Sequence, residues 1–120
     1  LLICLLPLTS HTQDILSLEL FSQLNPGAYL INPARGEHLV EKDLLTALQT
    51  GQLSGALLDV FREEPLPSNH PFWKAENITI TPHVAASTNP RTARDQVAEN
   101  ISRIKAGKVA LNLIDRNQEY

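Results

Sequence analysis

The stretch AYLINPARG, residues 28–36, places a short apolar run directly before a turn that carries an arginine. The apolar part, Ala28–Asn32, is predicted to be a strand, because the turn signal Asn25-Pro26-Gly27 precedes it. A helix is predicted to follow from about Glu41 to Thr50, with Gly51 at its C-terminal cap. A strand followed by a helix is the repeating unit of α/β proteins, so this stretch indicates the fold class.

The same alternation of strands and helices extends over the rest of the chain. Residues 1–6 are a continuous apolar run that Pro7 ends, which is typical of a strand covered on both faces. The remaining predicted elements are a short helix capped by Ser17, a strand at Gly55–Val60, a proline-rich loop at Glu64–Lys74, a strand at Ile78–Thr81, a helix from Asn89-Pro90 to about Ala106, and an irregular tail to Tyr120. Alternation with short connections predicts an α/β fold with a parallel sheet.

The composition makes several kinds of partner unexpected. The chain has 120 residues, of which 42% are hydrophobic and 19% charged, and its net charge is -3 without a cluster of Lys and Arg, so no nucleic acid is expected. The apolar residues 1–8 are fewer than the roughly 20 that cross a bilayer, so no membrane association is expected. Cys4 is the single cysteine, so no intrachain disulfide can form and a cytoplasmic location is expected.

Charged side chains follow three of the predicted strands. Arg35 follows the second strand, Asp59 and Glu64 follow the apolar run of the third, and His83 follows the fourth. In open parallel sheets the chemistry gathers at the carboxyl ends of the strands, so we expect these groups to lie near one another.

These residue types suit one kind of chemistry. An arginine presents a rigid fork of donors that holds a carboxylate through two parallel hydrogen bonds. A histidine exchanges a proton near neutral pH, and a neighbouring carboxylate orients the ring and favours its charged form. Together they could hold a 2-keto acid and protonate its carbonyl oxygen while a hydride reaches carbon 2.

Each of these residues also has an ordinary structural interpretation when it is taken alone. Arg35 could be a surface residue, His83 a structural histidine, Glu64 a loop carboxylate and Asp59 a turn or helix cap. Their occurrence together, each after a predicted strand, favours a functional site.

Three segments resemble the successive motifs of the D-isomer-specific 2-hydroxyacid dehydrogenases. They are Asn32-Pro33-Ala34-Arg35-Gly36, Asp59-Val60-Phe61-Arg62-Glu63-Glu64-Pro65 and Thr81-Pro82-His83-Val84-Ala85, and Pro71-Phe72-Trp73 is similar to the family's loop before the last strand. The resemblance covers nearly the whole chain. The tail, with Asn112, Asp115, Arg116 and Tyr120, resembles a bacterial branch of the family that reduces glyoxylate and hydroxypyruvate.

The resemblance implies a fold and an activity. Residues 1–88 would be the second half of a Rossmann-like NAD(P)-binding domain, and residues 89–120 a returning helix and tail toward the substrate domain. The activity would be reduction of small 2-keto acids to 2-hydroxy acids with NAD(P)H, and the branch favours NADPH. Arg35 would bind the substrate carboxylate, His83 would be the general acid/base, and Glu64 its partner.

The resemblance also implies a set of residues around the cofactor. Asp59 would contact the carboxamide of the nicotinamide, and Pro7 would lie against the adenosine part. The residues expected to border the cofactor are Pro7, Pro33, Ala34, Arg35, Asp59, His83, Ala85 and Ala86. Where the family often has a glycine after its Pro-His segment, this chain has Ala85-Ala86, and we expect a modest effect.

The sequence lacks the G-x-G-x-x-G loop that opens a dinucleotide-binding half, and it contains no methionine. Both observations lead us to expect a fragment of a longer protein that is inactive alone and forms a homodimer when complete. The alternatives are a catalytically silent NAD(P)-sensing module and a dimerisation module of the same fold.

The other histidines do not suggest a metal site. His11, His38 and His70 show no spacing of metal ligands and stand beside no cysteine pair, so a non-catalytic role is expected for each.

Overall fold

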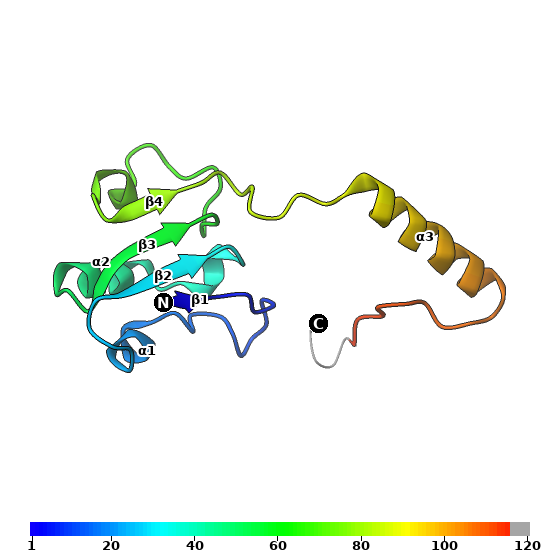
Figure 1. Ribbon diagram of the computed structural model, residues 1–120, viewed down its shortest axis with the longest axis horizontal. Coiled ribbons are helices and arrows are strands. Elements are labelled where there is room, and N and C mark those ends of the chain that lie inside the picture. The colour runs from blue at the N-terminus through cyan, green and yellow to red at the C-terminus, as the bar shows by residue number, and fades with distance from the viewer. Residues whose placement is uncertain (116–120) are drawn as a thin grey trace. The chain divides into compact units, whose positions relative to one another are not determined.

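The computed structural model describes residues 1–115, and its core is a parallel sheet in the sequential order β1-β2-β3-β4 (Figure 1). The strands are Leu2–Ile3 (β1), Ala28–Asn32 (β2), Leu53–Leu58 (β3) and Ile78–Ile80 (β4). The helices are Leu18–Ser22 (α1), Glu41–Gln49 (α2) and Pro90–Lys105 (α3), with 3-10 helices at Gly36–His38 (η1) and Pro71–Lys74 (η2). The predicted α/β fold with a parallel sheet is confirmed.

The hydrophobic core lies where α1 and α2 pack on the sheet. α1 contacts α2, and α2 contacts β3. Phe21 of α1 and Leu44 of α2 are fully buried, as are Leu30 of β2 and Leu58 of β3. Burial of each such side chain contributes about 1.5–3 kcal/mol, so this core holds the carboxyl ends of the strands in fixed register.

The first strand differs from the prediction. A strand covered on both faces was expected over residues 1–6, but β1 has two residues and is an edge strand that pairs with β2. Cys4 is buried, whereas Ile3 is 48% exposed and Leu5 is 77% exposed. Within the first unit, residues 1–85, the side that carries Ile3 and Leu5 is exposed, so the apolar run is half-covered there.

The other strand boundaries are close to the predicted ones. β2 has the predicted bounds, β3 begins and ends two residues before them, and β4 ends one residue early. The glycines at the turns agree with the prediction, because Gly27 and Gly51 both have a φ of 75°.

The proline-rich loop contains a helical turn that the prediction missed. Pro71 starts η2, where its fixed φ suits the first turn and its missing N–H is not needed. The His70 ring accepts a hydrogen bond from the Phe72 amide at 3.3 Å, and Phe72 is buried. The prolines therefore begin a short helix here as well as interrupt the chain.

The chain divides into two compact units, Leu1–Ala85 and a second unit that begins at Ala86. The second unit contains α3, which begins as predicted: the Asn89 side chain accepts a hydrogen bond from the Arg91 amide at 3.0 Å. Its apolar residues Val97, Ile101 and Ile104 are exposed. None of the helices in the described part of the chain is long and apolar enough to cross a membrane.

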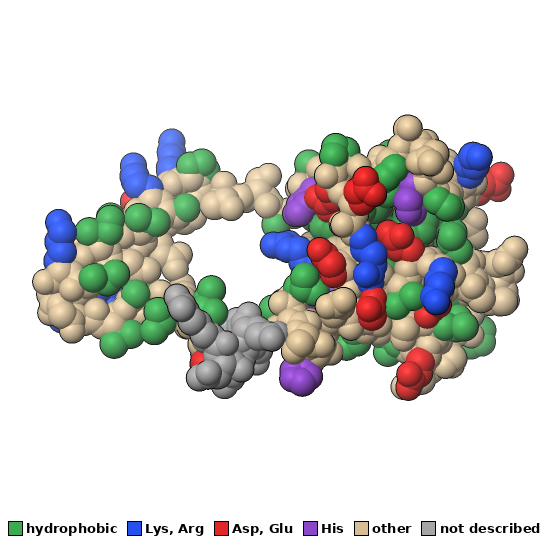
Figure 2. All heavy atoms as spheres, turned by 180° about the vertical axis from the view of Figure 1, so that it is seen from behind, with side chains coloured by type: hydrophobic (Ala, Val, Ile, Leu, Met, Phe, Trp, Pro, Cys, Tyr) green, Lys and Arg blue, Asp and Glu red, His purple; other side chains and the backbone are tan. Residues whose placement is uncertain are grey.

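The two units differ in the surface that they present in Figure 2. The first unit shows acidic and basic side chains close together, and the unit with α3 shows several exposed hydrophobic side chains. The predicted tail motif includes Arg116 and Tyr120, which lie outside the described residues, and residues 107–115 form no helix or strand.

Candidate active site

Arg35, Glu64 and His83 line one cavity of about 230 Å³. Arg35 follows β2, Glu64 follows β3 and His83 follows β4. Because the strands are parallel, their carboxyl ends meet at one edge of the sheet, and the residues that follow them come together there. The structure thus brings together the three side chains that the sequence predicts to be catalytic.

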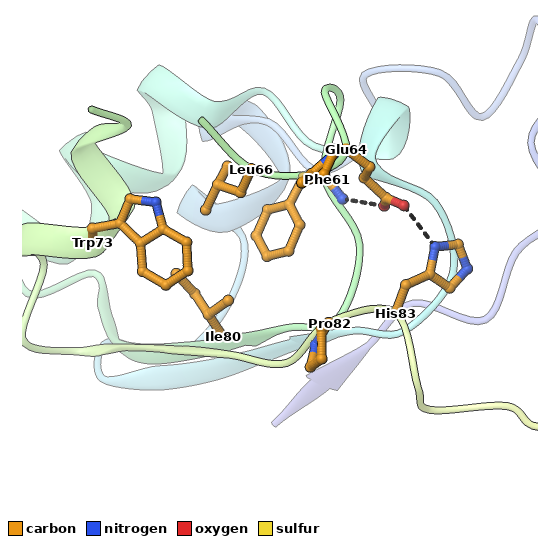
Figure 3. Close-up of a pocket in the computed structure, with 8 residues that line it drawn as sticks. Phe61, Glu64, Leu66, Trp73, Ile80, Pro82 and His83 are labelled. Carbon is orange, nitrogen blue, oxygen red and sulfur yellow. Dashed lines mark hydrogen bonds and ion pairs between the residues drawn. The ribbon is translucent and has the colours of Figure 1, made fainter. Parts of the chain in front are cut away.

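Glu64 and His83 form a hydrogen-bonded pair (Figure 3). Glu64 Oε2 lies 2.8 Å from His83 Nδ1, and Glu64 Oε1 accepts a hydrogen bond from the Phe61 amide at 2.9 Å. The hydrogen bond with His83 lowers the pKa of Glu64, and it outweighs the burial that would raise this pKa. The Phe61 amide and the positive charge of Arg35 act in the same direction. Glu64 is therefore a carboxylate that accepts from the Nδ1–H of His83.

The backbone conformation at His83 directs its side chain toward Glu64. His83 has a φ of 54°, in the left-handed region that non-glycine residues seldom occupy. Its amide donates to the Asp59 carbonyl oxygen at 2.8 Å, which ties it to the end of β3. Residues in such conformations cost free energy and gather at functional sites.

Asp59 is a buried carboxylate that holds the segment after His83. Its side chain is 1% exposed and accepts hydrogen bonds from the Thr81 hydroxyl, the Val84 amide at 3.0 Å and the Ala85 amide at 2.8 Å. Burial alone would raise the pKa of Asp59, but these hydrogen bonds outweigh it, and the pKa lies below its usual value. The predicted contact between Asp59 and a cofactor stays a prediction.

The Arg35 loop is shaped by the buried side chain of Asn32. Asn32 Nδ2 donates to the Arg35 carbonyl oxygen at 3.0 Å, and Asn32 Oδ1 accepts from the Ala34 amide at 3.2 Å. The Arg35 side chain is exposed, and its Nη1 donates to the Ala34 carbonyl oxygen at 2.7 Å. The loop is therefore fixed by its backbone, while the guanidinium stays accessible from solvent.

Gly36 allows the arginine loop to touch the loop that carries Glu64. A Cβ added at Gly36 would lie 1.9 Å from the Phe61 carbonyl carbon and 2.4 Å from the Arg62 nitrogen. Real Cβ atoms essentially never come within 3.0 Å of another atom, so a glycine is required at this position. The close contact of two backbones sets the spacing between Arg35 and Glu64.

A second, larger cavity adjoins the pair on its apolar side (Figure 3). It has a volume of about 470 Å³, and Phe61, Leu66, Trp73, Ile80 and Pro82 supply its apolar lining. The Trp73 ring is half-exposed and donates to the Pro67 carbonyl oxygen at 2.8 Å. Glu64 and His83 border this cavity as well as the smaller one, and in Figure 3 the His83 ring lies at the side opposite Trp73.

The residues predicted to border a cofactor lie in the loops at the carboxyl ends of the strands. Pro7 lies beyond β1, Pro33 and Ala34 follow β2, and Ala85 and Ala86 follow His83. The alanine side chains at these places are small, and Ala85 and Ala86 are exposed. None of these five residues lines the 230 Å³ cavity, and their contact with a cofactor stays a prediction.

Three residues that organise the site were missed or given no functional role from the sequence. Asn32 was treated as a strand end, His38 as non-catalytic, and Arg62 as part of a motif. Arg62 donates to the Leu39 carbonyl oxygen at 2.8 Å and to the Glu37 carbonyl oxygen at 3.1 Å, and it pairs with Asp14. A polar residue at the end of a buried strand was the available signal for Asn32, whereas His38 and Arg62 had none.

The parallel α/β sheet, with an arginine and a His–Glu pair at its strand ends, can be compared with known proteins. The family model for the D-isomer specific 2-hydroxyacid dehydrogenase, NAD binding domain, matches residues 1–85. The chain belongs to this family. A more particular likeness is to glyoxylate/hydroxypyruvate reductase A of Yersinia enterocolitica, which is 57% identical over 120 residues, covering 100% of this chain and 38% of the relative.

Solved structures show the same likeness. A D-isomer specific 2-hydroxyacid dehydrogenase from Xanthobacter autotrophicus, in complex with NADPH and MES, is 43% identical with a TM-score of 0.94, and the match covers 98% of this chain and 49% of that one. An NADPH-dependent glyoxylate/hydroxypyruvate reductase from Sinorhizobium meliloti, in complex with NADP and sulfate, is 40% identical with a TM-score of 0.91, covering 98% and 39%. The chain thus spans well under two thirds of the length of these relatives.

Proposed function

We propose that this chain is the C-terminal part of an NADPH-dependent reductase of small 2-keto acids such as glyoxylate and hydroxypyruvate. The observation that carries the proposal is the 2.8 Å contact between His83 Nδ1 and Glu64 Oε2, beside Arg35 in one cavity. The names of the relatives support the substrate class, and the NADP(H) bound in the solved structures supports the cofactor.

We assign a separate task to each of the three side chains. Glu64 accepts a hydrogen bond from His83 Nδ1–H, so His83 Nε2 is left to exchange a proton with the substrate. In the direction of reduction, protonated His83 donates from Nε2 to the carbonyl oxygen of the keto acid, and Glu64 stabilises its charged form. Arg35 binds the substrate carboxylate through its guanidinium fork. In the reverse direction neutral His83 takes the proton of the hydroxyl group.

NADPH would supply the hydride when it is bound. The residues that would hold its nicotinamide are Pro33, Ala34, Ala85 and Ala86, while Pro7 would lie against the adenosine part. Asp59 would serve this site directly at the carboxamide, or by holding the Ala85 amide in place. We also propose that the complete protein is a homodimer in the cytoplasm.

The test uses the complete reductase, by which we mean the full-length protein that contains this chain. His83→Gln should lower kcat for glyoxylate by about 100-fold or more, because general acid–base catalysis contributes about 10²–10⁴-fold. The Kd for NADPH should stay close to that of the parent, because the substitution removes proton transfer and leaves the loop backbone in place. Steady-state kinetics and fluorescence titration measure the two constants.

His70→Gln is a matched control, because the His70 ring pairs with Glu41 and the Phe72 amide rather than with the cavity. It should keep the parent kcat. Undiminished turnover in His83→Gln would refute the catalytic assignment. NADPH binding without any turnover in the parent would instead favour a silent sensing module.

A further inference from the structure

His38 is a buried side chain for which the proposed mechanism has no use. It ends η1 and is 0% exposed. Its Nδ1 lies 3.1 Å from the carbonyl oxygen of Arg35, and its Nε2 lies 3.3 Å from the carbonyl oxygen of Pro7. One imidazole ring therefore contacts both the loop after β1 and the loop after β2.

Both partners of the ring are hydrogen-bond acceptors, which determines what the ring must do. A carbonyl oxygen can only accept, so His38 stabilises each contact by donating an N–H. A neutral ring donates to one of the two carbonyl groups, and a protonated ring donates to both. Because a buried polar group is costly without a partner, the ring is held where both carbonyl oxygens lie within reach.

Each of the two loops is also closed by its own hydrogen bonds. The Arg35 carbonyl oxygen accepts from Asn32 Nδ2 at 3.0 Å, and the Pro7 carbonyl oxygen accepts from the Thr12 hydroxyl at 2.6 Å. The segment after β1 is joined to β2 by a hydrogen bond from the Cys4 amide to the Ile31 carbonyl oxygen, at 3.0 Å. Further along, backbone hydrogen bonds join the two segments again, from the Asp14 amide to the Glu37 carbonyl oxygen at 3.0 Å and from the Leu16 amide to the His38 carbonyl oxygen at 2.9 Å. The His38 ring is what links Pro7 itself to Arg35.

We propose that His38 is a positioning residue that fixes the Pro7 segment and the Arg35 loop relative to each other. The inference rests on the proposed function, in which Pro7 borders the cofactor and Arg35 binds the substrate carboxylate. Through backbone contacts at its two nitrogens, a single ring then aligns the cofactor side of the site with the substrate side.

The alternative is a histidine that contributes only to the stability of the core. Two amide substitutions separate these roles, because each keeps one donor of the ring. The side-chain nitrogen of asparagine takes the place of Nδ1, and that of glutamine takes the place of Nε2. His38→Asn should therefore keep the contact with Arg35, and His38→Gln should keep the contact with Pro7.

The experiment measures two constants for each variant of the complete reductase. Losing the ring's hydrogen bond to one of the two carbonyl oxygens should change the corresponding constant by about three- to tenfold. His38→Asn should raise the Kd for NADPH by this factor and keep the KM for glyoxylate within about twofold of the parent. His38→Gln should do the reverse, and His38→Leu should raise both constants.

A purely structural role would lower the unfolding midpoint in both amide variants without this split, in which one variant changes the Kd for NADPH and the other the KM for glyoxylate. Equal responses of the two constants, or no response in either variant, would overturn the inference. His70→Asn and His70→Gln are the matched controls and should show no split. If His38→Leu fails to fold, the asparagine and glutamine variants still decide.

The experiment also separates this inference from the proposed function. Absence of turnover in the parent would overturn the proposed function first, and this inference with it, whereas turnover without a split overturns the inference alone.

Discussion

Asp59 is a single buried charge that holds the segment after His83 through hydrogen bonds. Its carboxylate binds the Thr81 hydroxyl and two amides directly after His83. These hydrogen bonds favour the charged form and keep its pKa below the usual value despite burial. The charge on Asp59 therefore stabilises the folded state, and the size of this stabilisation depends on pH.

The sign of the pH dependence follows from the direction of the shift. A carboxyl group with a lowered pKa stabilises the fold above its ordinary value, 3.8, and this contribution is lost as the pH falls through the folded pKa. Asp59→Asn should lower the free energy of unfolding by about 1–3 kcal/mol near pH 6, because the Val84 and Ala85 amides lose their charged acceptor. The gap between parent and variant should narrow below pH 3.8.

Urea unfolding of the complete reductase at several pH values measures this gap. Asp95→Asn is the control, because Asp95 is exposed and pairs with its neighbour Arg94. It should change stability by less than about 1 kcal/mol. A gap for Asp59→Asn that is constant across the acid range would contradict the assigned hydrogen bonds.

The single residues also show where sequence reasoning stops. The grouping of Arg35, Glu64 and His83 could be predicted, because each follows a predicted strand and the carboxyl ends of parallel strands meet at one edge of the sheet. Asn32 and His38 could not be assigned their roles, because their partners are backbone oxygens and amides that become neighbours only in the folded chain. Such contacts leave no pattern of spacing in the sequence.

Among the elements, the contact between the start of η1 and the loop after β3 carries a testable consequence. Gly36→Ala would place a Cβ 1.9 Å from the Phe61 carbonyl carbon, so the two loops must separate. Displacing a substrate-binding group by about 1 Å can cost about 100-fold in rate, and we expect a fall of this order in kcat/KM for glyoxylate. Steady-state kinetics of the complete reductase measure it.

Gly107→Ala is the matched control for this substitution. Gly107 has a φ of 69° and open space around its Cβ position, so alanine there costs about 1–2 kcal/mol of local strain. It should lower the unfolding midpoint slightly and keep kcat/KM. A Gly36→Ala variant with parental kinetics would show that the loops do not need their close contact.

The elements themselves were predictable to different degrees. β2 was predicted at its full length, because a turn signal and an arginine turn bound it on both sides. The strand over residues 1–6 was predicted too long, because an apolar run does not reveal how many neighbours a strand has. η1 and η2 were missed, because single helical turns depend on tertiary contacts such as the burial of His38 and Phe72.

At the scale of the whole molecule, the sequence contains the proposed acid/base pair and the proposed substrate-binding arginine but no glycine-rich phosphate loop. We therefore predict that the isolated 120 residues do not reduce glyoxylate. A fluorescence titration with NADPH and a spectrophotometric assay measure binding and turnover. Micromolar binding together with turnover would show that these residues suffice.

The division of the chain after Ala85 has a consequence for limited proteolysis. Asp59 binds the Val84 and Ala85 amides, so the chain is held to the end of β3 up to the last residue of the first unit. Residues 86–89 are exposed and lie outside any helix or strand, which are properties of preferred cleavage sites. A protease that cuts there would divide the chain into one piece with the sheet and the His83–Glu64 pair and another piece with α3.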